Sequence, residues 1–127
     1  MISSAMVVHY IEDMDEALSF YKDGIGLTAT TESPGWSTLR VTETFELAVH
    51  TRGEGAAPID RQAAHPFDAF VSTLVLTVDD LEAYCERIVK LGGTLDRVLE
   101  PRDGIPVRMA LVRDPSNNGF QVNQYVG

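Results

Sequence analysis

The feature that most constrains the fold of this chain is an internal repeat with a spacing of 67 residues. Asp13 and Asp80 precede similar helical patterns, and Gly26 and Gly93 follow those patterns at the same spacing. A repeat of this length indicates that one supersecondary unit occurs twice. The two halves of the chain are therefore expected to share one design.

Each half begins with a β-branched apolar run, continues into a helical pattern and ends in three short strand candidates. The first helix is expected to begin after Asp13, which forms a capping signal with Glu16 three residues later. The expected strands are 5–11, 27–31, 36–41 and 45–50 in the first half and 72–78, 94–98, 107–112 and 120–126 in the second, and the second helix is expected to run from Leu81 to about Lys90.

This order of elements predicts an α+β fold of two tandem βαβββ modules, whose curved mixed sheets surround a shared cavity. We expect a single domain over residues 1–127, with modules at about 5–50 and 72–126. The segment 51–71 is rich in Gly, Pro and Ala without a clear period, which is typical of a linker.

Composition limits the classes of function. The chain has 127 residues, of which 44% are hydrophobic, so one domain can bury a core. Its formal net charge is −9, whereas binding to nucleic acid or to an anionic membrane surface relies on Lys and Arg, so neither partner is expected. Cys85 is the only cysteine, and the first residues lack the pattern of a secretory signal. We expect a cytoplasmic protein that binds a neutral or cationic small molecule.

A compact turn followed by a strand lies near the end of the chain. Asp114 and Pro115 open the turn, the next residues supply side chains that form local turns, and Gly119 is expected to take a positive φ. The strand that follows alternates between apolar and polar residues, with Gln121 and Asn123 on its polar face.

This turn and strand resemble the closing motif of the vicinal oxygen chelate superfamily, which includes glyoxalase I, the extradiol dioxygenases and the bleomycin-resistance proteins. That motif, Asp-Pro-x-Gly-Asn-x-x-Glu, ends in a carboxylate that binds metal, and Gln121 stands at its position here. Residues 13–27 also resemble the signature of the family's first module, an Asp followed by Phe-Tyr and a Leu-Gly or similar ending. Together the motifs cover nearly the whole chain.

In the metal-dependent members of this family, the opening strand and the last strand of each module supply one metal ligand each. The family pattern places these positions at Met6, Glu46, Thr73 and Gln121. Met, Thr and Gln side chains are poor ligands for a divalent transition metal in such a site. The resemblance therefore implies that a site of two histidines and two glutamates is absent, and we expect no metal and no cofactor.

The three histidines do not readily complete such a site. His9 lies three residues beyond Met6, so strand alternation turns its ring toward the helix. His50 shares the face of Glu46, but four strand residues separate the two by about 13 Å. His65 lies in the linker and is expected to be an exposed histidine.

Strand alternation from the four family positions also predicts the lining of the cavity. The expected ligand-binding residues are Met6, Tyr10, Trp36, Glu46, His50, Thr73, Gln121 and Asn123, and the same parity adds Val8, Ala48, Val75, Thr77 and Tyr125 to the lining. Trp36 is expected to stack on a flat ligand, with core packing as the alternative for Trp36 and Tyr10. For Gln121 and Asn123 the alternative is a polar face toward solvent or a partner subunit.

Glu46 is the candidate catalytic residue. Inside an apolar cavity, burial would raise the pKa of this carboxyl group and make it a general base, whereas an ionised Glu46 would pair with a cation on the ligand. The alternative is that the side chain points outward.

Three functions remain open, and we favour a metal-free binding protein similar to the bleomycin-resistance branch. Such a protein would hold a planar or amphipathic small molecule, for example an antibiotic, against Trp36 and Tyr10, with Glu46 and Gln121 as polar contacts. The second function is a metal-independent isomerase, lyase or cyclase that uses Glu46 as base and Tyr10 or Gln121 to stabilise negative charge.

The third function is a metal-dependent glyoxalase or dioxygenase that recruits His9 or His50. Whether the chain is an enzyme therefore stays open at this point. The family usually forms dimers, and the sheet edges of two four-stranded modules need covering, so we expect a homodimer.

Overall fold

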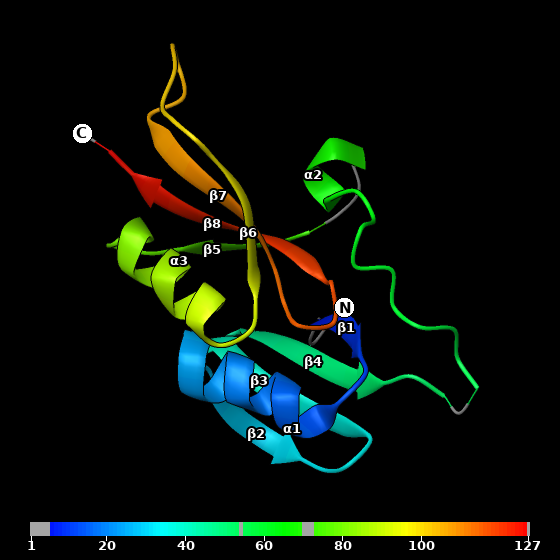
Figure 1. Ribbon diagram of the computed structural model, residues 1–127. Coiled ribbons are helices and arrows are strands. Elements are labelled where there is room, and N and C mark those ends of the chain that lie inside the picture. The colour runs from blue at the N-terminus through cyan, green and yellow to red at the C-terminus, as the bar shows by residue number, and fades with distance from the viewer. Residues whose placement is uncertain (1–5, 54, 70–72, 127) are drawn as a thin grey trace, which may run out of the picture.

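The computed structural model describes residues 6–53, 55–69 and 73–126 and contains two modules of like design (Figure 1). The first module consists of β1 (Met6–Ile11), α1 (Met14–Leu18), η1 (Ser19–Ile25), β2 (Thr28–Glu32), β3 (Trp36–Thr42) and β4 (Phe45–Thr51). The second consists of β5 (Leu74–Thr77), α3 (Leu81–Lys90), β6 (Thr94–Leu99), β7 (Val107–Arg113) and β8 (Gly119–Tyr125), and α2 (Pro66–Ala69) lies between the modules in sequence.

The predicted α+β class and the βαβββ order of both modules are confirmed. Every expected strand is present, and its bounds agree to within two residues. Residues 5 and 72, expected as the first residues of strands, lie outside the described residues. The segment expected to be a linker differs in one respect, because it contains the short helix α2.

Each module forms a four-stranded mixed sheet. The strand orders are β1-β4-β3-β2 and β5-β8-β7-β6, with β1 and β5 parallel to their neighbours and the other pairs antiparallel. In Figure 1 the first sheet lies below the second, and α1 and α3 lie on the same side of the molecule. The parallel pairs are possible because a helical connection separates each first strand from the rest of its module.

The helices begin as the capping signals predict and end differently from one another. The side chain of Asp13 accepts a hydrogen bond from the backbone N of Glu16 at 2.8 Å, and Asp80 accepts one from Ala83 at 3.1 Å. The first helix widens into the π-helix η1 and ends at Gly26, with φ of 93°. No helix in the described ranges has the length and apolarity needed to cross a membrane.

The repeat does not extend to the conformation of its glycines. In the second module Gly92, with φ of 90°, takes the left-handed conformation at the end of α3. Gly93, the sequence equivalent of Gly26, is instead packed tightly: a Cβ there would lie 2.6 Å from Phe20, 2.7 Å from Ile88 and 2.8 Å from a backbone oxygen. Close contacts with Phe20 of the first module and with Ile88 and Arg113 of its own module therefore explain this glycine.

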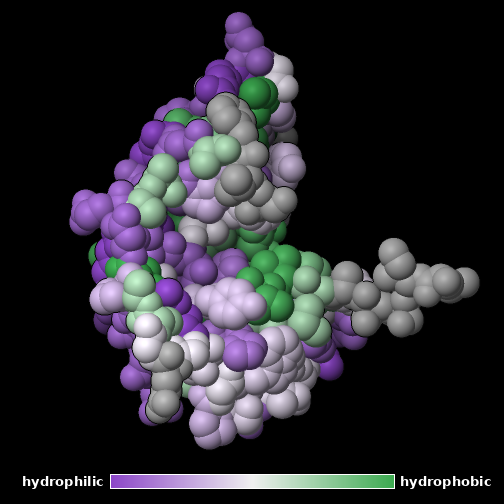
Figure 2. Space-filling view, turned by 90° about the vertical axis from the view of Figure 1, so that its right-hand side faces the viewer, coloured by the Kyte–Doolittle hydropathy of each residue, from purple (hydrophilic) through white to green (hydrophobic). Residues whose placement is uncertain are grey.

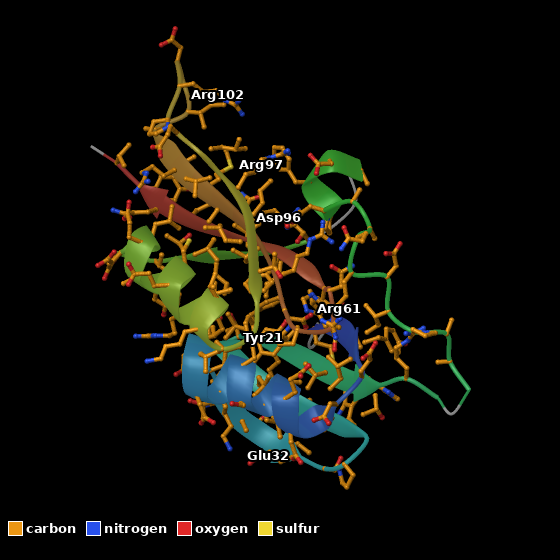
Figure 3. The ribbon with its side chains drawn as sticks, viewed as in Figure 1. Tyr21, Glu32, Arg61, Asp96, Arg97 and Arg102 are labelled. Atoms are coloured by element: carbon orange, nitrogen blue, oxygen red, sulfur yellow. The ribbon has the colours of Figure 1, made fainter. Side chains whose placement is uncertain are left out.

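The two modules share one hydrophobic core, which lies on the helix-covered faces of the sheets. Phe20 and Tyr21 of η1 pack against Phe120 of β8, with ring centroids 6.3 and 6.2 Å from Phe120. All three side chains are fully buried. Figure 3 shows Tyr21 between the upper and lower modules.

The turn from Asp114 to Asn118 joins the second module to the first. The backbone N of Glu12 donates to the hydroxyl of Ser116 at 2.9 Å, and the side-chain amide of Asn118 donates to the carbonyl of Tyr10 at 2.7 Å. Asn117, with φ of 67°, provides the left-handed residue of this turn. The expectation that Gly119 takes a positive φ is therefore wrong, because Gly119 already belongs to β8.

A chain of buried hydrogen bonds runs from His9 through Tyr21 to Asp114. The Tyr21 hydroxyl donates to Oδ2 of Asp114 at 3.0 Å, and Nδ1 of His9 lies 3.0 Å from the same hydroxyl. Since the one hydroxyl proton points to Asp114, the Tyr21 oxygen accepts from His9, which assigns the proton of the neutral imidazole to Nδ1. The ring of His9 thus faces the helix side, as strand alternation predicts.

Burial controls the protonation of this chain. It lowers the pKa of His9 from 6.5 to about 4. Burial and the neighbouring Asp114 raise the pKa of Tyr21 well above its ordinary value. Burial also raises the pKa of Asp114, although hydrogen bonds from Asn118, Tyr21 and Ser116 act in the opposite direction.

Replacing Tyr21 by Phe is expected to destabilise the fold by about 1–3 kcal/mol, because both His9 and Asp114 would lose a buried partner. The free energy of unfolding in urea measures this change. Tyr84→Phe is the matched control, since its hydroxyl makes only a 3.5 Å contact with the carbonyl of Ile25 and its loss should cost less than about 0.5 kcal/mol. Equal losses in the two variants would contradict a structural role for the buried chain.

His9 should give the stability a pH dependence of defined sign. Because its folded pKa of about 4 lies below its unfolded value of 6.5, the unfolded chain takes up the proton first as the pH falls. The free energy of unfolding should therefore fall between about pH 6.5 and 4, by at most about 3 kcal/mol. Urea unfolding of the wild type and of His9→Gln at pH 7 and pH 4.5 isolates this contribution from that of Asp114. The same pH dependence in both proteins would exclude His9 as its source.

Candidate functional site

The face of the first sheet that is turned away from the helices carries most of the predicted site residues. Register pairing places Met6, Glu46 and Arg40 in one row across β1, β4 and β3. The next row holds Val8, Ala48 and Thr38, and the third holds Tyr10, His50 and Trp36. We call this surface the open face of the first sheet. Met6, Val8 and Tyr10 are exposed on it, so it is available to a ligand.

Three aromatic side chains form a cluster in the third row of this open face. The ring centroid of His50 lies 5.6 Å from that of Tyr10 and 5.5 Å from that of Trp36, and the Trp36 contact is edge to face. Tyr10 is 58% exposed and Trp36 is half-buried. The core-packing alternative for Tyr10 is therefore wrong. The cluster presents a large aromatic surface, which is suited to contact with a planar molecule.

One hydrogen bond orients the imidazole of His50. Its Nδ1 lies 2.6 Å from the carbonyl oxygen of Thr51. A carbonyl only accepts, so Nδ1 carries a proton, and in the neutral ring Nε2 is left as an acceptor. His50 thus combines an aromatic edge with one hydrogen-bond acceptor on the open face.

Glu46 lies on the same face, two rows from the aromatic cluster. Its side chain is half-buried, and its partners across the strands are Met6 and Arg40. Within the described residues no ion pair joins Arg40 to Glu46. The row therefore offers one acidic and one basic group to a ligand. Register places Glu46 on the open face, and the alternative that its side chain points outward stays open.

The corresponding face of the second sheet carries the remaining predicted residues. Gln121 lies between Val75 and Leu111, and its amide donates to the side-chain oxygen of Asn123 at 3.0 Å. Asn123 is buried, and Gln121 is half-buried. The alternative of a polar face turned to solvent is therefore wrong for Asn123.

The four family positions do not fit a metal of the kind expected from two histidines and two glutamates. Met6 and Glu46 are direct neighbours, but Val75, rather than Thr73, lies beside Gln121. The hydroxyl of Thr73 donates to the carbonyl of Gly119 at 3.0 Å. In the ranges 6–53, 55–69 and 73–126, no three His, Cys, Asp or Glu side chains gather in a way that could hold a metal ion. Glu46 is the only carboxylate of the four positions.

The expectation that His65 is exposed is wrong. The side chain is 1% exposed, and Nε2 lies 3.0 Å from the carbonyl oxygens of both Val112 and Phe120. The backbone N of Phe67 donates to Nδ1 at 3.1 Å, so both ring nitrogens are used. His65 therefore anchors the segment before α2 to the second sheet.

Helix α2 is held beside the second sheet by further contacts. Arg97 of β6 pairs with Asp68 and lies over the ring of Phe67 at 5.7 Å (Figure 3). A Cβ on Gly119 would lie 2.3 Å from the ring of Pro66, so the glycine permits this close approach. The predicted linker thus covers part of the second sheet. On the open face of the first sheet Met6, Val8 and Tyr10 stay exposed, whereas Ala48 and Thr38 are buried.

Figure 2 shows the molecule hollowed between its upper and lower parts, with hydrophobic residues beside the hollow. Exposed apolar and aromatic side chains of both sheets belong to the predicted lining: Met6, Val8, Tyr10, Val75 and Tyr125. Sequence reasoning missed Arg40 and placed His65 wrongly at the surface. Alternation from Trp36 would have placed Arg40 on the open face, whereas no local signal identifies the contacts of His65.

Residues 4–122 match the model of a protein family described as the Glyoxalase/Bleomycin resistance protein/Dioxygenase superfamily. A lactoylglutathione lyase of Haemophilus influenzae is 28% identical to this chain over 119 residues, which cover 88% of this chain and 83% of that protein.

Solved structures of related proteins show the same fold. A glyoxalase-related enzyme from Fulvimarina pelagi aligns with a TM-score of 0.67 at 19% identity, over 98% of this chain and 88% of that chain. The lactoylglutathione lyase of Agrobacterium tumefaciens aligns with a TM-score of 0.64 at 21% identity, over 97% of this chain and 94% of that chain.

His65→Ala is expected to destabilise the protein by about 2–4 kcal/mol, because it removes a buried side chain and leaves the Val112 and Phe120 carbonyls without this donor. Urea unfolding measures the loss, and hydrogen exchange should show faster exchange of the α2 amides. Val89→Ala is the control, because its exposed side chain should contribute less than about 0.5 kcal/mol. A stability of His65→Ala equal to that of Val89→Ala would exclude the anchoring role.

Proposed function

Because this chain belongs to the Glyoxalase/Bleomycin resistance protein/Dioxygenase superfamily, we propose that it is a small-molecule-binding protein of the bleomycin-resistance type. The ligand is planar and aromatic or amphipathic, and it binds on the open face of the first sheet without a metal. The observation that carries this proposal is the cluster of Tyr10, His50 and Trp36. The three rings lie on adjacent strands, so the sheet itself holds them in place.

The chemistry of the open face supports a ligand with a flat ring and a polar end. The aromatic cluster offers apolar contact area, and the Nε2 of His50 offers an acceptor beside it. Two rows away, Glu46 and Arg40 provide groups of opposite charge. The net charge of −9 favours a neutral or cationic ligand over an anionic one.

The composition of the four family positions supports the metal-free part of the proposal. Met6, Thr73 and Gln121 replace three of the ligands that a site of two histidines and two glutamates requires. Thr73 and Gln121 are also engaged in hydrogen bonds within the second sheet. Binding by aromatic stacking needs none of these positions to hold an ion.

A homodimer is part of this proposal. Met6 is 45% exposed and Tyr125 is 65% exposed, which leaves apolar surface of both sheets uncovered in one chain. A second copy would cover this surface and enclose a ligand. Native mass spectrometry would then detect the mass of a dimer. A cytoplasmic location is also part of this proposal, and the single cysteine, which is buried and unpaired, agrees with it.

A second candidate function is that of a glyoxalase, which the similarity to the lactoylglutathione lyase of Haemophilus influenzae favours. Glu46 stands at the family's carboxylate position and faces the open side of the sheet. In this alternative Glu46 acts as a general base that moves a proton on the substrate. Glu46→Gln should then abolish turnover, whereas in a binding protein it should only weaken affinity.

Native mass spectrometry of the protein, purified from cells grown with transition metals, should show an apo dimer or a dimer with an organic ligand. Trp36 is the only tryptophan, so its fluorescence reports binding directly. Titration with metal-free bleomycin in the presence of a chelator should show saturable binding. Tyr10→Ala should weaken this binding about tenfold, because loss of an aromatic contact costs about 1–1.5 kcal/mol.

Tyr84→Phe serves as the control for the titration, because Tyr84 belongs to α3 on the helix side and should leave affinity unchanged. One tightly bound metal per chain, together with chelator-sensitive lactoylglutathione lyase activity, would overturn the metal-free proposal. The same affinity in the wild type and in Tyr10→Ala would exclude the aromatic cluster as the binding site.

A further inference from the structure

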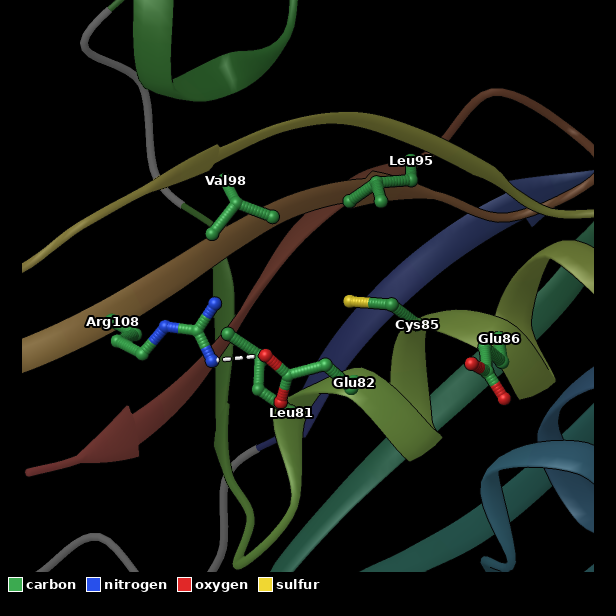
Figure 4. Close-up of a pocket in the computed structure, with 7 residues that line it drawn as sticks. All are labelled: Leu81, Glu82, Cys85, Glu86, Leu95, Val98 and Arg108. Carbon is green, nitrogen blue, oxygen red and sulfur yellow. Dashed lines mark hydrogen bonds and ion pairs between the residues drawn. The ribbon is translucent and has the colours of Figure 1, made fainter.

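A cavity of about 200 Å³ lies between α3 and the strands β6 and β7 (Figure 4). Its apolar lining consists of Leu81 and Cys85 from α3 and Leu95 and Val98 from β6. Arg108 of β7 and two glutamates of α3 complete the lining. This cavity is on the helix-covered face of the second sheet, so it is separate from the open faces described above.

An irregularity in β6 explains why two apolar side chains line this cavity. The pairing of β6 with β7 shifts register between Leu95 and Arg97, so Leu95 and Val98, three residues apart, face the helix together. Arg97 and Leu99 consequently belong to the other face of the strand. Without the bulge, strict alternation would turn one of the two apolar side chains away from α3.

Short side chains opposite these residues leave the space unfilled. Val98 pairs across the strands with Ala110, which has only a methyl group. Cys85 is the α3 residue that faces β6, and Figure 4 shows its sulfur directed toward Leu95 and Val98. A longer apolar residue at position 85 would occupy this volume.

The thiol of Cys85 behaves as part of the apolar lining. It is buried, and burial together with the charge of Glu82 raises the pKa of the thiol above its ordinary value, against a smaller opposing effect of Arg108. The thiol is therefore protonated at neutral pH and acts as a small hydrophobic group rather than as a nucleophile.

Two of the three charged groups that line the cavity, Arg108 and Glu82, are paired with each other. Arg108 donates from Nε and Nη2 to the two carboxylate oxygens of Glu100, at 2.9 and 3.0 Å, and from Nη1 to Glu82. The guanidinium of Arg108 is therefore hydrogen-bonded to Glu100 on one side and to Glu82 on the other. The cavity thus offers no free cation to an anionic ligand. Glu86 is the one charged group of the lining for which the described residues provide no ion pair, and the rest of the uncharged lining is apolar.

The size and chemistry of this space define its occupant. The space opens to solvent beside Glu82 and Glu86, unlike a closed core cavity. Its volume of about 200 Å³ exceeds the roughly 150 Å³ that holds benzene in a protein core, so it has room for a single aromatic ring. We propose that the cavity behind α3 is a second small-molecule site, which takes an uncharged apolar molecule of about the size of one substituted benzene ring. This proposal does not depend on the function proposed for the open face.

Cys85 makes the proposal directly testable, because it is the only thiol in the chain. The rate at which iodoacetamide alkylates Cys85 in the native protein should fall several-fold in buffer saturated with toluene. The urea midpoint of unfolding should rise under the same conditions, because toluene would bind only the folded state. Alkylation of the urea-unfolded chain should be unaffected, which controls for a direct effect of toluene on the reagent.

A variant that fills the cavity and a matched control test whether toluene raises the urea midpoint by binding in the cavity. Cys85→Met should lose the toluene-dependent rise in the urea midpoint, because its side chain occupies the cavity. Val89→Met, at an exposed position of the same helix, should keep the rise. Leu95→Ala should widen the cavity and extend the effect to 1-methylnaphthalene, which tests the proposal independently of how well Cys85→Met folds.

Trp36→Ala separates this site from the open face of the first sheet. Protection of Cys85 by toluene in this variant, at the wild-type level, supports the second site. An alkylation rate and a urea midpoint that toluene leaves unchanged would overturn the proposal. So would protection that Trp36→Ala abolishes, because toluene would then act through the aromatic cluster.

Discussion

The hydrogen bond from Tyr21 to Asp114 is the interaction on which the arrangement of the two modules depends. A buried carboxylate is costly unless its oxygens are satisfied. Asp114 accepts from the backbone N of Ser116 at 2.9 Å, from the backbone and side chain of Asn118 at 2.8 and 2.9 Å, and from Tyr21 at 3.0 Å. Three of these donors belong to its own turn, and the fourth comes from the other module. The carboxylate of Asp114 therefore stabilises both the shape of the turn and its position beside the first module.

This connection places the candidate site. Asn118 donates to the carbonyl of Tyr10, so the turn that Asp114 organises also contacts the end of β1 where the aromatic cluster begins. The helix-covered faces of both sheets meet at Phe20, Tyr21 and Phe120, which leaves the opposite faces free of the core. A ligand on the open face of the first sheet would thus bind a rigid surface that the core behind it supports. The second sheet differs, because α2 and His65 pack against it and because a cavity lies between α3 and β6.

The order and bounds of the elements were predictable because they depend on local patterns. Asp13 and Asp80 cap helices as their side chains predict, and the alternation from Met6 to Tyr10 assigns the correct side chains to the open face. The predictions failed where the decisive contact comes from far along the chain. The sequence predicts an exposed His65, but the ring is buried and hydrogen-bonded to carbonyls 47 and 55 residues away. Gly119 and Gly93 were interpreted as turn or helix-end signals, whereas close contacts with Pro66 and with Phe20 explain them.

By itself, the sequence determined the repeated module, the polarity of each strand face and the identity of the side chains at the four family positions. These properties follow from residue type and from periods of two and 3.6 residues, which need no knowledge of distant segments. Only the tertiary structure decided that Tyr10, His50 and Trp36 form one cluster, because strand register brings together residues up to 40 positions apart. It also decided that Asp114 pairs with Tyr21 and that Cys85 faces a cavity, since packing between modules and a shift of register have no local signature in the chain.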